Sequence, residues 1–532
     1  MTTVPLYSDD TLQIPGWVED EILYPMKSND SLLSALAKEH APETTGLASR
    51  FESVRKHALW LILVSAEALI PCFWHPQIEA GDLASHSYNA WLTNLVTQDK
   101  APGLWIAPQS NNILFDILLF RLTSLLGFVA GEKIAVCIAV LIFLWGAFSF
   151  ASAMSGRLAW FLLPLLATLA YGWTMQMGFF NFYLALGLSF IALAALSRGR
   201  GRDYLYAVTL APLIFLAHPL GAAWFFAMAF YILIAGLIKP PVQWVLLLAA
   251  IAGAIILRVY LARHYRVQFW SGHFYDLNGS DQLSLGTRYQ FLSSCLLLAV
   301  LASVLLHILR IRGTSIENKF PVSLQLFVVC SVGLCLLPDF IRFPSYAEPV
   351  SLISSRFTLA VGVLGCCALA NLRARLLFAS LTGVIALCYF GFLYRDTAKT
   401  YALERQAEVL TAQVPQDGRV IATIFPFRGS RVFVHHVVER ACIGRCFVID
   451  NYEPASGQFR LRANPDGRLV ASSSEDTNRM MLGNYVVQPE DLPLWQIFQC
   501  GPWDIDLCLR PLQAGSLLTN SQDVTRARKL DK

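Results

Sequence analysis

Asp82 and His86 are the residues whose types and spacing most directly suggest chemistry. They lie four residues apart in the polar stretch 75–105, so a helix over 82–93 would place a carboxylate and an imidazole on one face. Such a pair can take a proton from a hydroxyl group. Glu79 supplies a second acid that could raise a neighbouring pKa, bind a divalent metal or cap the helix. A helix cap is also an alternative role for Asp82.

The elements that position these residues are hydrophobic. Of the 532 residues, 55% are hydrophobic and 15% are charged, whereas an average soluble protein has about 25% charged residues. This composition indicates a mainly α-helical, polytopic membrane protein. The net charge of +4 gives no reason to expect nucleic-acid binding. The chain contains no G-x-x-x-x-G-K-[ST], H-E-x-x-H or G-x-S-x-G motif, so ATP-driven transport by this chain alone is not expected.

The apolar segments predict a bundle of about eleven transmembrane helices within residues 57–395. The preceding stretch 1–56 is polar and acidic, which indicates a cytoplasmic tail rather than a cleavable signal peptide. Basic residues gather in the loops predicted to be inside, most clearly at 198–202. In the first outer loop, residues 112–128 are predicted to form an interfacial helix. The predicted outer loops are 75–131, 262–288 and 339–351.

The last part of the chain, residues 396–532, has the composition of a soluble domain. The predicted topology places it outside the cytoplasm. Alternation of apolar and polar residues, with turn residues between, predicts a small mixed α/β domain. Its predicted strands are 418–425, 431–438 and 458–462.

The cysteines support this orientation. Eight of the twelve lie in or beside predicted spans, where a free cysteine acts as a small hydrophobic residue. The other four are in the soluble domain, and an even number in an exported domain predicts two disulfides. They are Cys442, Cys446, Cys500 and Cys508, and pairing of sequence neighbours is one of three connectivities. A metal site formed with His435 and His436 is an alternative, although no C-x-x-C spacing is present.

Several basic residues fall on the predicted outer side, against the usual excess of positive charge inside. An anionic partner such as a phosphate group would explain them. The candidate phosphate- or substrate-binding residues are His218, Arg263, Arg266, His273, Arg288, Arg342 and Arg356. Arg342 and Arg356 are the favoured members. The alternative for each arginine is snorkelling, or a pair with Glu348 or Asp339.

An outer carboxylate beside cationic groups and long apolar helices suits transfer of a sugar from a lipid-linked phosphate donor. Over residues 56–395 the order of elements resembles the GT-C superfamily of polyprenyl-phosphate-sugar-dependent glycosyltransferases. Two patterns, GFFNFYLALGL (178–188) and NYEPASGQFRLRA (451–463), resemble uncharacterised bacterial membrane proteins of this type. The adjacent acidic pair common in the superfamily is absent, because Gly81 and Leu83 flank Asp82.

The resemblance implies an inverting glycosyltransferase in which Asp82 is the general base and His86 or Glu79 orients it. The donor would be a polyprenyl-phosphate-linked sugar and the acceptor a glycan, a lipid or a protein. Such a protein would be a multi-pass component of the plasma membrane, surrounded by lipid, with a cytoplasmic N-terminus and an extracytoplasmic C-terminal domain. The single acid leaves the dependence on a divalent metal open.

Two functions from other classes are also consistent with the sequence. In a transporter or flippase of lipid-linked saccharides, Glu67 of the first span, Asp82 and the arginines would line a path through the membrane. Such a path needs charged residues at mid-membrane depth on several spans, and beyond Glu67 few are found. In an assembly subunit of the cell envelope, the outer domain would bind a partner and Asp82 would be dispensable.

Overall fold

The computed structural model of the chain describes residues 58–269, 272, 276–311, 321–344, 346–501 and 505–518. The chain is mainly helical, with 64% of residues in helices and a small strand-containing region near the C-terminus. This confirms the predicted fold class in its broad form. The predicted cytoplasmic tail 1–56 and His273 lie outside the described residues.

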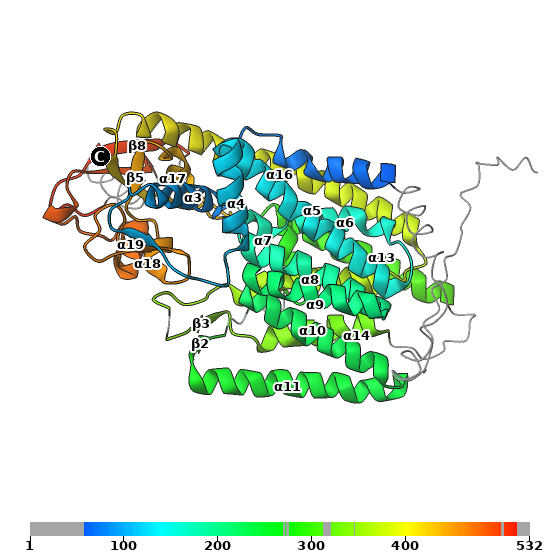
Figure 1. Cartoon of the computed structure of the whole chain (residues 1–532). Coiled ribbons are helices and arrows are strands. Elements are labelled where there is room, and N and C mark those ends of the chain that lie inside the picture. The colour runs from blue at the N-terminus through cyan, green and yellow to red at the C-terminus, as the bar shows by residue number, and fades with distance from the viewer. Residues whose placement is uncertain are drawn as a thin grey trace, which may run out of the picture. The chain divides into compact units, whose positions relative to one another are not determined.

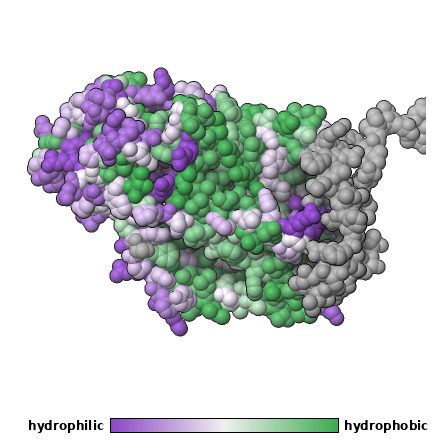
Figure 2. Space-filling view, viewed as in Figure 1, coloured by the Kyte–Doolittle hydropathy of each residue, from purple (hydrophilic) through white to green (hydrophobic). Residues whose placement is uncertain are grey.

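Six helices in the described part of the chain are long and apolar enough to cross a membrane. They are α5 (Phe128–Ser155), α8 (Phe180–Arg198), α10 (Pro219–Leu237), α11 (Gln243–His264), α13 (Tyr289–Ile311) and α16 (Arg375–Thr411). Hydrophobic residues cover the helical part of the molecule, and hydrophilic residues gather over the strand-containing part (Figure 2). These features identify a membrane protein.

The six helices are fewer than the eleven predicted spans, because the other predicted spans correspond to shorter helices. These are Ala58–Cys72, α6 (Leu163–Ala170), α9 (Gly201–Ala217), α14 (Val322–Leu336) and α15 (Ile353–Leu369). The predicted span 158–174 is interrupted: α6 ends at Ala170, and a separate short helix, α7 (Trp173–Gln176), follows.

Buried hydrogen bonds hold the chain in place at the interruption after α6. The end of the second predicted outer loop folds into a buried 3-10 turn, η4 (Ser280–Leu283). Gln282 of this turn accepts hydrogen bonds from the backbone N and the hydroxyl of Thr174, each 3.0 Å long, and it donates to Thr358 of α15 at 2.7 Å. Because buried polar groups need partners, the hydrogen bonds of Gln282 fix the helix that contains Thr174 to α15.

The C-terminal region forms the predicted small α/β domain around a four-stranded sheet with the order β5-β4-β7-β8. Strand β4 (Gly418–Thr423) pairs in parallel with β5 (Cys446–Val448) and with β7 (Leu494–Gln499), and β7 pairs antiparallel with β8 (Leu507–Pro511). The prediction of a strand at 418–425 is therefore confirmed. The predicted strand 431–438 is wrong, because this stretch is a loop that leads into the short helix α17 (Val437–Ala441).

Helix α16 joins the membrane helices to this domain without a break. Its 37 residues extend for about 55 Å, which is longer than the roughly 30 Å hydrocarbon layer of a membrane. Leu403 and Ala407 near its C-terminal end lie in the core of the α/β domain. The predicted domain boundary at 395–396 falls inside this helix, so the helix sets the distance between the two regions.

The first predicted outer loop packs on both regions: Tyr88, Leu92 and Leu104 lie in the core of the C-terminal domain, whereas Phe115 and Leu119 lie in the core of the helix bundle. It contains α3 (Leu83–Thr97), strand β1 (Leu104–Ile106) and α4 (Leu114–Leu126), and α4 corresponds to the predicted interfacial helix (Figure 1). Strand β1 pairs antiparallel with β6 (Leu461–Ala463). On α3, the buried Tyr88 hydroxyl accepts a 2.8 Å hydrogen bond from the backbone N of Val448 in β5.

The two edge strands of the four-stranded sheet each carry a disulfide. Cys442 bonds to Cys446 with an S–S distance of 2.12 Å, and Cys500 bonds to Cys508 with 2.07 Å. This confirms the predicted disulfides and selects the pairing of sequence neighbours. The other eight cysteines are free thiols.

Alkylation of the denatured protein tests this arrangement. Without reductant, a maleimide should label eight thiols per chain, and after reduction it should label twelve, because disulfide sulfurs do not react. Intact-mass spectrometry counts the labels. Twelve labels without reductant would contradict both bonds, and a Cys442→Ser/Cys446→Ser double variant, with ten after reduction, serves as the control.

Candidate active site around Asp82

The backbone of Asp82 is fixed before the first turn of α3 by the turn 176–178. Gly81 N donates to Gln176 O at 2.7 Å, and Asp82 N donates to Met177 O at 3.0 Å. Gly178 has a φ of +85°, and a Cβ atom there would lie 2.5 Å from Asp82 N. Only glycine suits this conformation and this close approach. The pattern that starts at Gly178 therefore begins with a residue that positions Asp82.

The Asp82 side chain does not cap α3, because it makes no hydrogen bond to the helix backbone. Its carboxylate faces the imidazole of His436, with 3.6 Å between Oδ1 and Nε2. The opposite ring nitrogen of His436, Nδ1, lies 2.8 Å from Oε1 of Glu439. His436 is 5% exposed and the Asp82 side chain 14%. A carboxylate, an imidazole and a second carboxylate thus follow one another across the junction of α3 and α17.

Electrostatics favour a charged His436 next to Asp82. Burial lowers the pKa of His436, but Glu439 and Asp82 raise it more, to about 9. Burial raises the pKa of Asp82, whereas the charges of His436, His86 and Arg356 lower it. Burial has the larger effect, so the pKa of Asp82 is raised overall, and the cationic neighbours keep it lower than burial alone would.

Among the arginines predicted to bind phosphate or substrate, Arg356 is one whose charge lowers the pKa of Asp82. It projects from α15, and its guanidinium carbon lies 3.9 Å from the ring centre of Phe179. Its Nε atom is buried and has no hydrogen-bond partner among the described residues. His218 has a different role, since its Nδ1 accepts from Leu220 N at 3.2 Å and caps α10.

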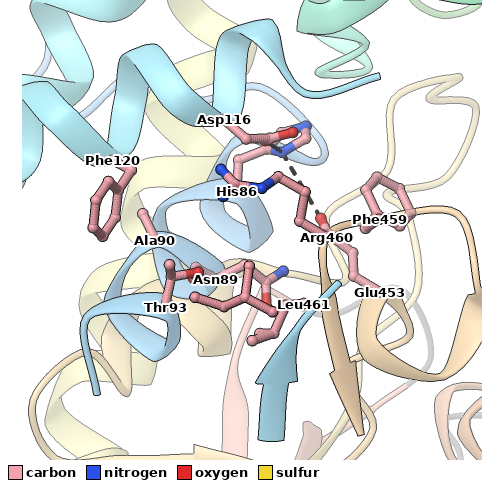
Figure 3. Close-up of a pocket in the computed structure, with 11 residues that line it drawn as sticks. His86, Asn89, Ala90, Thr93, Asp116, Phe120, Glu453, Phe459, Arg460 and Leu461 are labelled. Atoms are coloured by element: carbon pink, nitrogen blue, oxygen red, sulfur yellow. Dashed lines mark hydrogen bonds and ion pairs between the residues drawn. The ribbon is translucent and has the colours of Figure 1, made fainter. Parts of the chain in front are cut away.

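His86 belongs to a second group of charges beside a pocket (Figure 3). Its Nδ1 lies 2.8 Å from Oδ1 of Asp116 and 3.8 Å from Oε1 of Glu453. Burial lowers the pKa of His86, but Asp116 and Glu453 raise it to about 10. Asp116 is held in turn by the side-chain amide of Asn181 at 2.9 Å. His86 thus points to Asp116 rather than to Asp82, and it affects Asp82 by lowering its pKa electrostatically.

Glu79 lies in a third group, around Arg440 of α17. The guanidinium is 3.9 Å from a Glu79 oxygen, 3.3 Å from Glu132 of α5 and 2.8 Å from Glu404 of α16. All four side chains are at most 6% exposed. Burial and the nearby Glu404 raise the pKa of Glu79. Glu79 is therefore part of an ionic cluster that holds α17 in place. The cation of this cluster, Arg440, lies one helical turn after His436.

The remaining predicted basic residues lie elsewhere. Arg266 of β2 (Arg266–Gln268) is directly opposite Arg342 of β3 (Phe340–Arg342), and both are exposed. Arg263 is exposed at the end of α11, and Arg288 pairs with Asp396 at 3.3 Å. Within the described residues, Asp82 forms no ion pair with any of these four arginines.

The alternative metal site is not formed by the residues proposed for it. The four cysteines of the domain are disulfide-bonded and cannot act as thiolate ligands. His435 Nδ1 contacts the carbonyl oxygen of Ile424. Across the parts of the chain that the structure describes, no cluster of three or more His, Cys, Asp or Glu side chains could hold a metal ion.

Four consecutive residues of the GFFNF pattern contact the site, and the fifth contacts His218. Gly178 meets the Asp82 backbone, Phe179 stacks on Arg356, Phe180 packs edge-on to His86, Asn181 binds Asp116, and Phe182 packs edge-on to His218. The second pattern, 451–463, supplies Glu453 and also Tyr452, whose ring centre is 5.5 Å from that of His436. Both sequence patterns thus line this site, although the sequence did not reveal that they meet there.

Comparisons with models of protein families, with characterised proteins and with experimentally determined structures found no match to this chain.

Proposed function

We propose that the chain is an integral-membrane glycosyltransferase of GT-C type, which moves a sugar from a lipid-linked phosphate donor to an acceptor, with Asp82 as general base. The observation that carries the proposal is the orientation of Asp82. Its carboxylate faces the His436–Glu439 pair and lies within the field of Arg356, and it leaves the backbone of α3 uncapped. An acid that is largely shielded from water, has cationic neighbours and lies next to apolar helices suits proton removal beside a departing phosphate.

The proposed reaction uses these positions. The acceptor hydroxyl gives its proton to Asp82, and its oxygen forms a bond to the anomeric carbon of the donor sugar. The bond from that carbon to the phosphate oxygen breaks, and the electron pair leaves with the lipid phosphate. Arg356 stabilises the negative charge that develops on the phosphate. Attack from the side opposite the leaving group inverts the anomeric configuration.

The proposal includes the topology. Eleven segments cross the plasma membrane, and five of these segments contain the shorter helices; one of them combines α6 with α7 and the turns beside them. The N-terminus is cytoplasmic, and α16 carries the C-terminal domain to the outer side. The two disulfides support this orientation, because such bonds persist outside the cytoplasm. The donor's lipid would lie among the apolar helices, while its phosphate reaches the site at the membrane surface.

The transporter alternative needs charged side chains along the inside of the helix bundle. Glu67 is exposed on the surface of its helix, and Asp82, His436 and Arg356 gather at one end of the bundle instead. The assembly-subunit alternative gives no role to a buried cationic environment around Asp82. Both alternatives remain outcomes of the experiment that follows.

Substitution of Asp82 by asparagine tests the function. A deletion strain is complemented with the wild type, Asp82→Asn or Asp99→Asn at equal membrane levels, and the envelope glycans are profiled by mass spectrometry. Asp82→Asn should reduce the product by about 100-fold or more, because it removes the base but keeps the shape. Asp99 is an exposed acid just after α3 with a φ of +56°, which asparagine also adopts, so Asp99→Asn should restore the profile fully.

Full restoration by Asp82→Asn would overturn the proposal, as would an unchanged profile in the deletion strain. A sugar that disappears on deletion and returns with the wild type and with Asp99→Asn would support it. The mass that is missing would then identify the transferred sugar.

A further inference from the structure

The ribbon formed by β2 and β3 lies at one end of α11 (Figure 1). The 22 residues of α11 extend for about 33 Å, which matches the roughly 30 Å hydrocarbon layer of a membrane. Helix α11 packs on α10 and α14, and nearly all of its remaining surface is exposed and apolar. Lipid therefore surrounds most of α11, and the ribbon that follows it lies at the level of the lipid head groups.

The two faces of the ribbon differ in chemistry. Ile341 of β3 is buried, and Val267, directly opposite it in β2, packs against the core of the helix bundle. Because successive strand residues point to opposite faces, Arg266 and Arg342 share the other face, and both are exposed. Arg263, three residues earlier at the end of α11, is exposed as well. Three exposed arginines thus lie at this end of α11.

The arrangement of Arg266 and Arg342 is unfavourable unless an anion compensates it. The two residues are directly opposite in the antiparallel pair, where Cβ atoms are about 4.5–5.5 Å apart and like charges destabilise the sheet. The acids expected as partners, Asp339 and Glu348, each accept a hydrogen bond from another side chain instead. Among the residues that the structure describes, neither arginine has an ion-pair partner.

Arg258, also on α11, shows the contacts of an arginine with an internal role. Its Nη1 donates to the carbonyl oxygens of Cys335 and Leu336, at 3.3 and 3.4 Å, and its guanidinium carbon lies 3.7 Å from the ring centre of Phe269. The carbonyl groups at the end of α14 thus use this cation. The three exposed arginines make no comparable contact within the described parts of the chain.

Aromatic residues around the ribbon support its position at the membrane surface. Tyr260 is exposed on the last turns of α11. Tyr265, between α11 and β2, packs edge-on to Phe343, with 5.3 Å between the ring centres. Tyrosine is enriched where a membrane meets water, because its ring is apolar and its hydroxyl is polar. The arginines therefore adjoin lipid head groups rather than open solvent.

We propose that Arg263, Arg266 and Arg342 form a docking surface for the phosphate groups of anionic phospholipids in the surrounding bilayer. A phosphate between Arg266 and Arg342 accepts charge-assisted hydrogen bonds from both guanidinium groups and replaces their repulsion by attraction. Arg263 adds a third cation where the helix leaves the hydrocarbon layer. The bound lipids fix the depth and tilt of α11, which has few protein neighbours.

The lipid-linked sugar donor is a second source of phosphate, but in the proposed function its phosphate has a different site. There the cation beside Asp82 is Arg356, whereas the three arginines at the end of α11 and on the ribbon form no ion pair with Asp82 in the described part of the chain. The inference also holds for a membrane protein that transfers no sugar, so it does not rest on the proposed function.

Thermal unfolding of the purified full-length protein in a neutral detergent tests the proposal. Dioleoyl-phosphatidylglycerol, which is anionic, or dioleoyl-phosphatidylcholine, which has no net charge, is titrated, and a lipid that binds the folded protein raises the unfolding midpoint. The wild type should bind phosphatidylglycerol at least tenfold more tightly than phosphatidylcholine. Arg266→Gln/Arg342→Gln should bind phosphatidylglycerol about 25-fold more weakly, roughly fivefold for each arginine.

Three further variants separate lipid binding from folding. Arg266→Lys/Arg342→Lys keeps both charges and should retain most of the binding. Arg266→Glu places an opposite charge across from Arg342, so it should fold at least as well without lipid but lose the shift caused by phosphatidylglycerol. Arg468→Gln/Arg479→Gln removes two exposed arginines of the C-terminal domain and should keep the whole shift.

Equal shifts with the two phospholipids would overturn the proposal, as would a phosphatidylglycerol shift that Arg266→Glu retains. Loss of the shift in about 10 mM inorganic phosphate would assign the surface to a free anion instead. Tighter binding of a polyprenyl phosphate than of phosphatidylglycerol, lost in Arg266→Glu, would assign it to the donor lipid and also overturn the proposal. A phosphatidylglycerol shift that is lost in Arg266→Glu and kept in Arg468→Gln/Arg479→Gln would support it.

Discussion

Replacement of Arg440 by methionine is expected to destabilise the protein by about 3–5 kcal/mol, the usual cost of removing one partner from a buried ion cluster. The substitution leaves Glu79, Glu132 and Glu404 buried without their shared cation. These acids come from the first predicted outer loop, α5 and α16, so the loss also loosens the contact between the helices and α17. The unfolding midpoint of the purified protein in detergent, followed by heat or by denaturant, measures the effect.

The control for this prediction is Arg405→Met. Arg405 is adjacent to Glu404 in sequence and pairs with Glu408, but its side chain is 58% exposed, so its loss should change the stability by less than about 1 kcal/mol. Adding Glu132→Gln and Glu404→Gln to Arg440→Met should recover part of the stability, because two of the orphaned charges are removed. Equal midpoints for Arg440→Met and Arg405→Met would show that the cluster does not stabilise the fold.

Replacement of His436 by glutamine is expected to change the pH dependence of sugar transfer. The cationic imidazole lowers the pKa of Asp82, so its removal lets burial raise that pKa further. The acidic limb of the rate profile should therefore move to higher pH by about 1–2 units, and below the midpoint the rate should fall roughly 10- to 100-fold. Well above both midpoints the wild type and the variant should transfer sugar at similar rates, because Asp82 is ionised in both.

The rate of transfer to the acceptor as a function of pH measures the position of the acidic limb. His435→Gln is the matched control, because burial and the neighbouring His436 lower the pKa of His435 to about 4, so the substitution removes no charge at neutral pH. Its profile should overlay that of the wild type. A His436→Gln profile with an unchanged acidic limb would mean that His436 does not act on the group that titrates.

The sequence was sufficient to predict what depends on local pattern. Long apolar stretches predict helices such as α5 and α13, because burying apolar residues in lipid or in a core requires paired backbone groups. The alternation in 418–425 likewise predicts β4. The same reasoning fails for 431–438, whose β-branched residues favour a strand. There the contacts of Arg440 and His436 with distant acids stabilise a loop and a helix instead.

In the candidate site, too, local patterns could be read from the sequence and contacts between distant residues could not. Asp82 could be identified because it lies in a polar loop before a helix with a histidine one turn later. His436 could not be identified as its partner, since it lies near the other end of the chain and no local rule relates the two positions. The GFFNF pattern contained a usable signal, because an asparagine within an apolar segment needs a polar partner. The partners of the pattern's residues, however, come from four other elements.

The pairing of β1 with β6 joins Leu104 to Ala463, and it has a consequence for biosynthesis. A ribosome completes the Asp82 loop early, but Glu439, Glu453 and strand β6 are synthesised only after all the apolar helices. In the proposed topology these late residues must also cross the membrane before the two strands can meet. An unfinished or stalled chain therefore contains Asp82 without its partners. Under the proposed function, such a product would not consume the lipid-linked donor, and activity would begin only when synthesis and export of the chain are complete.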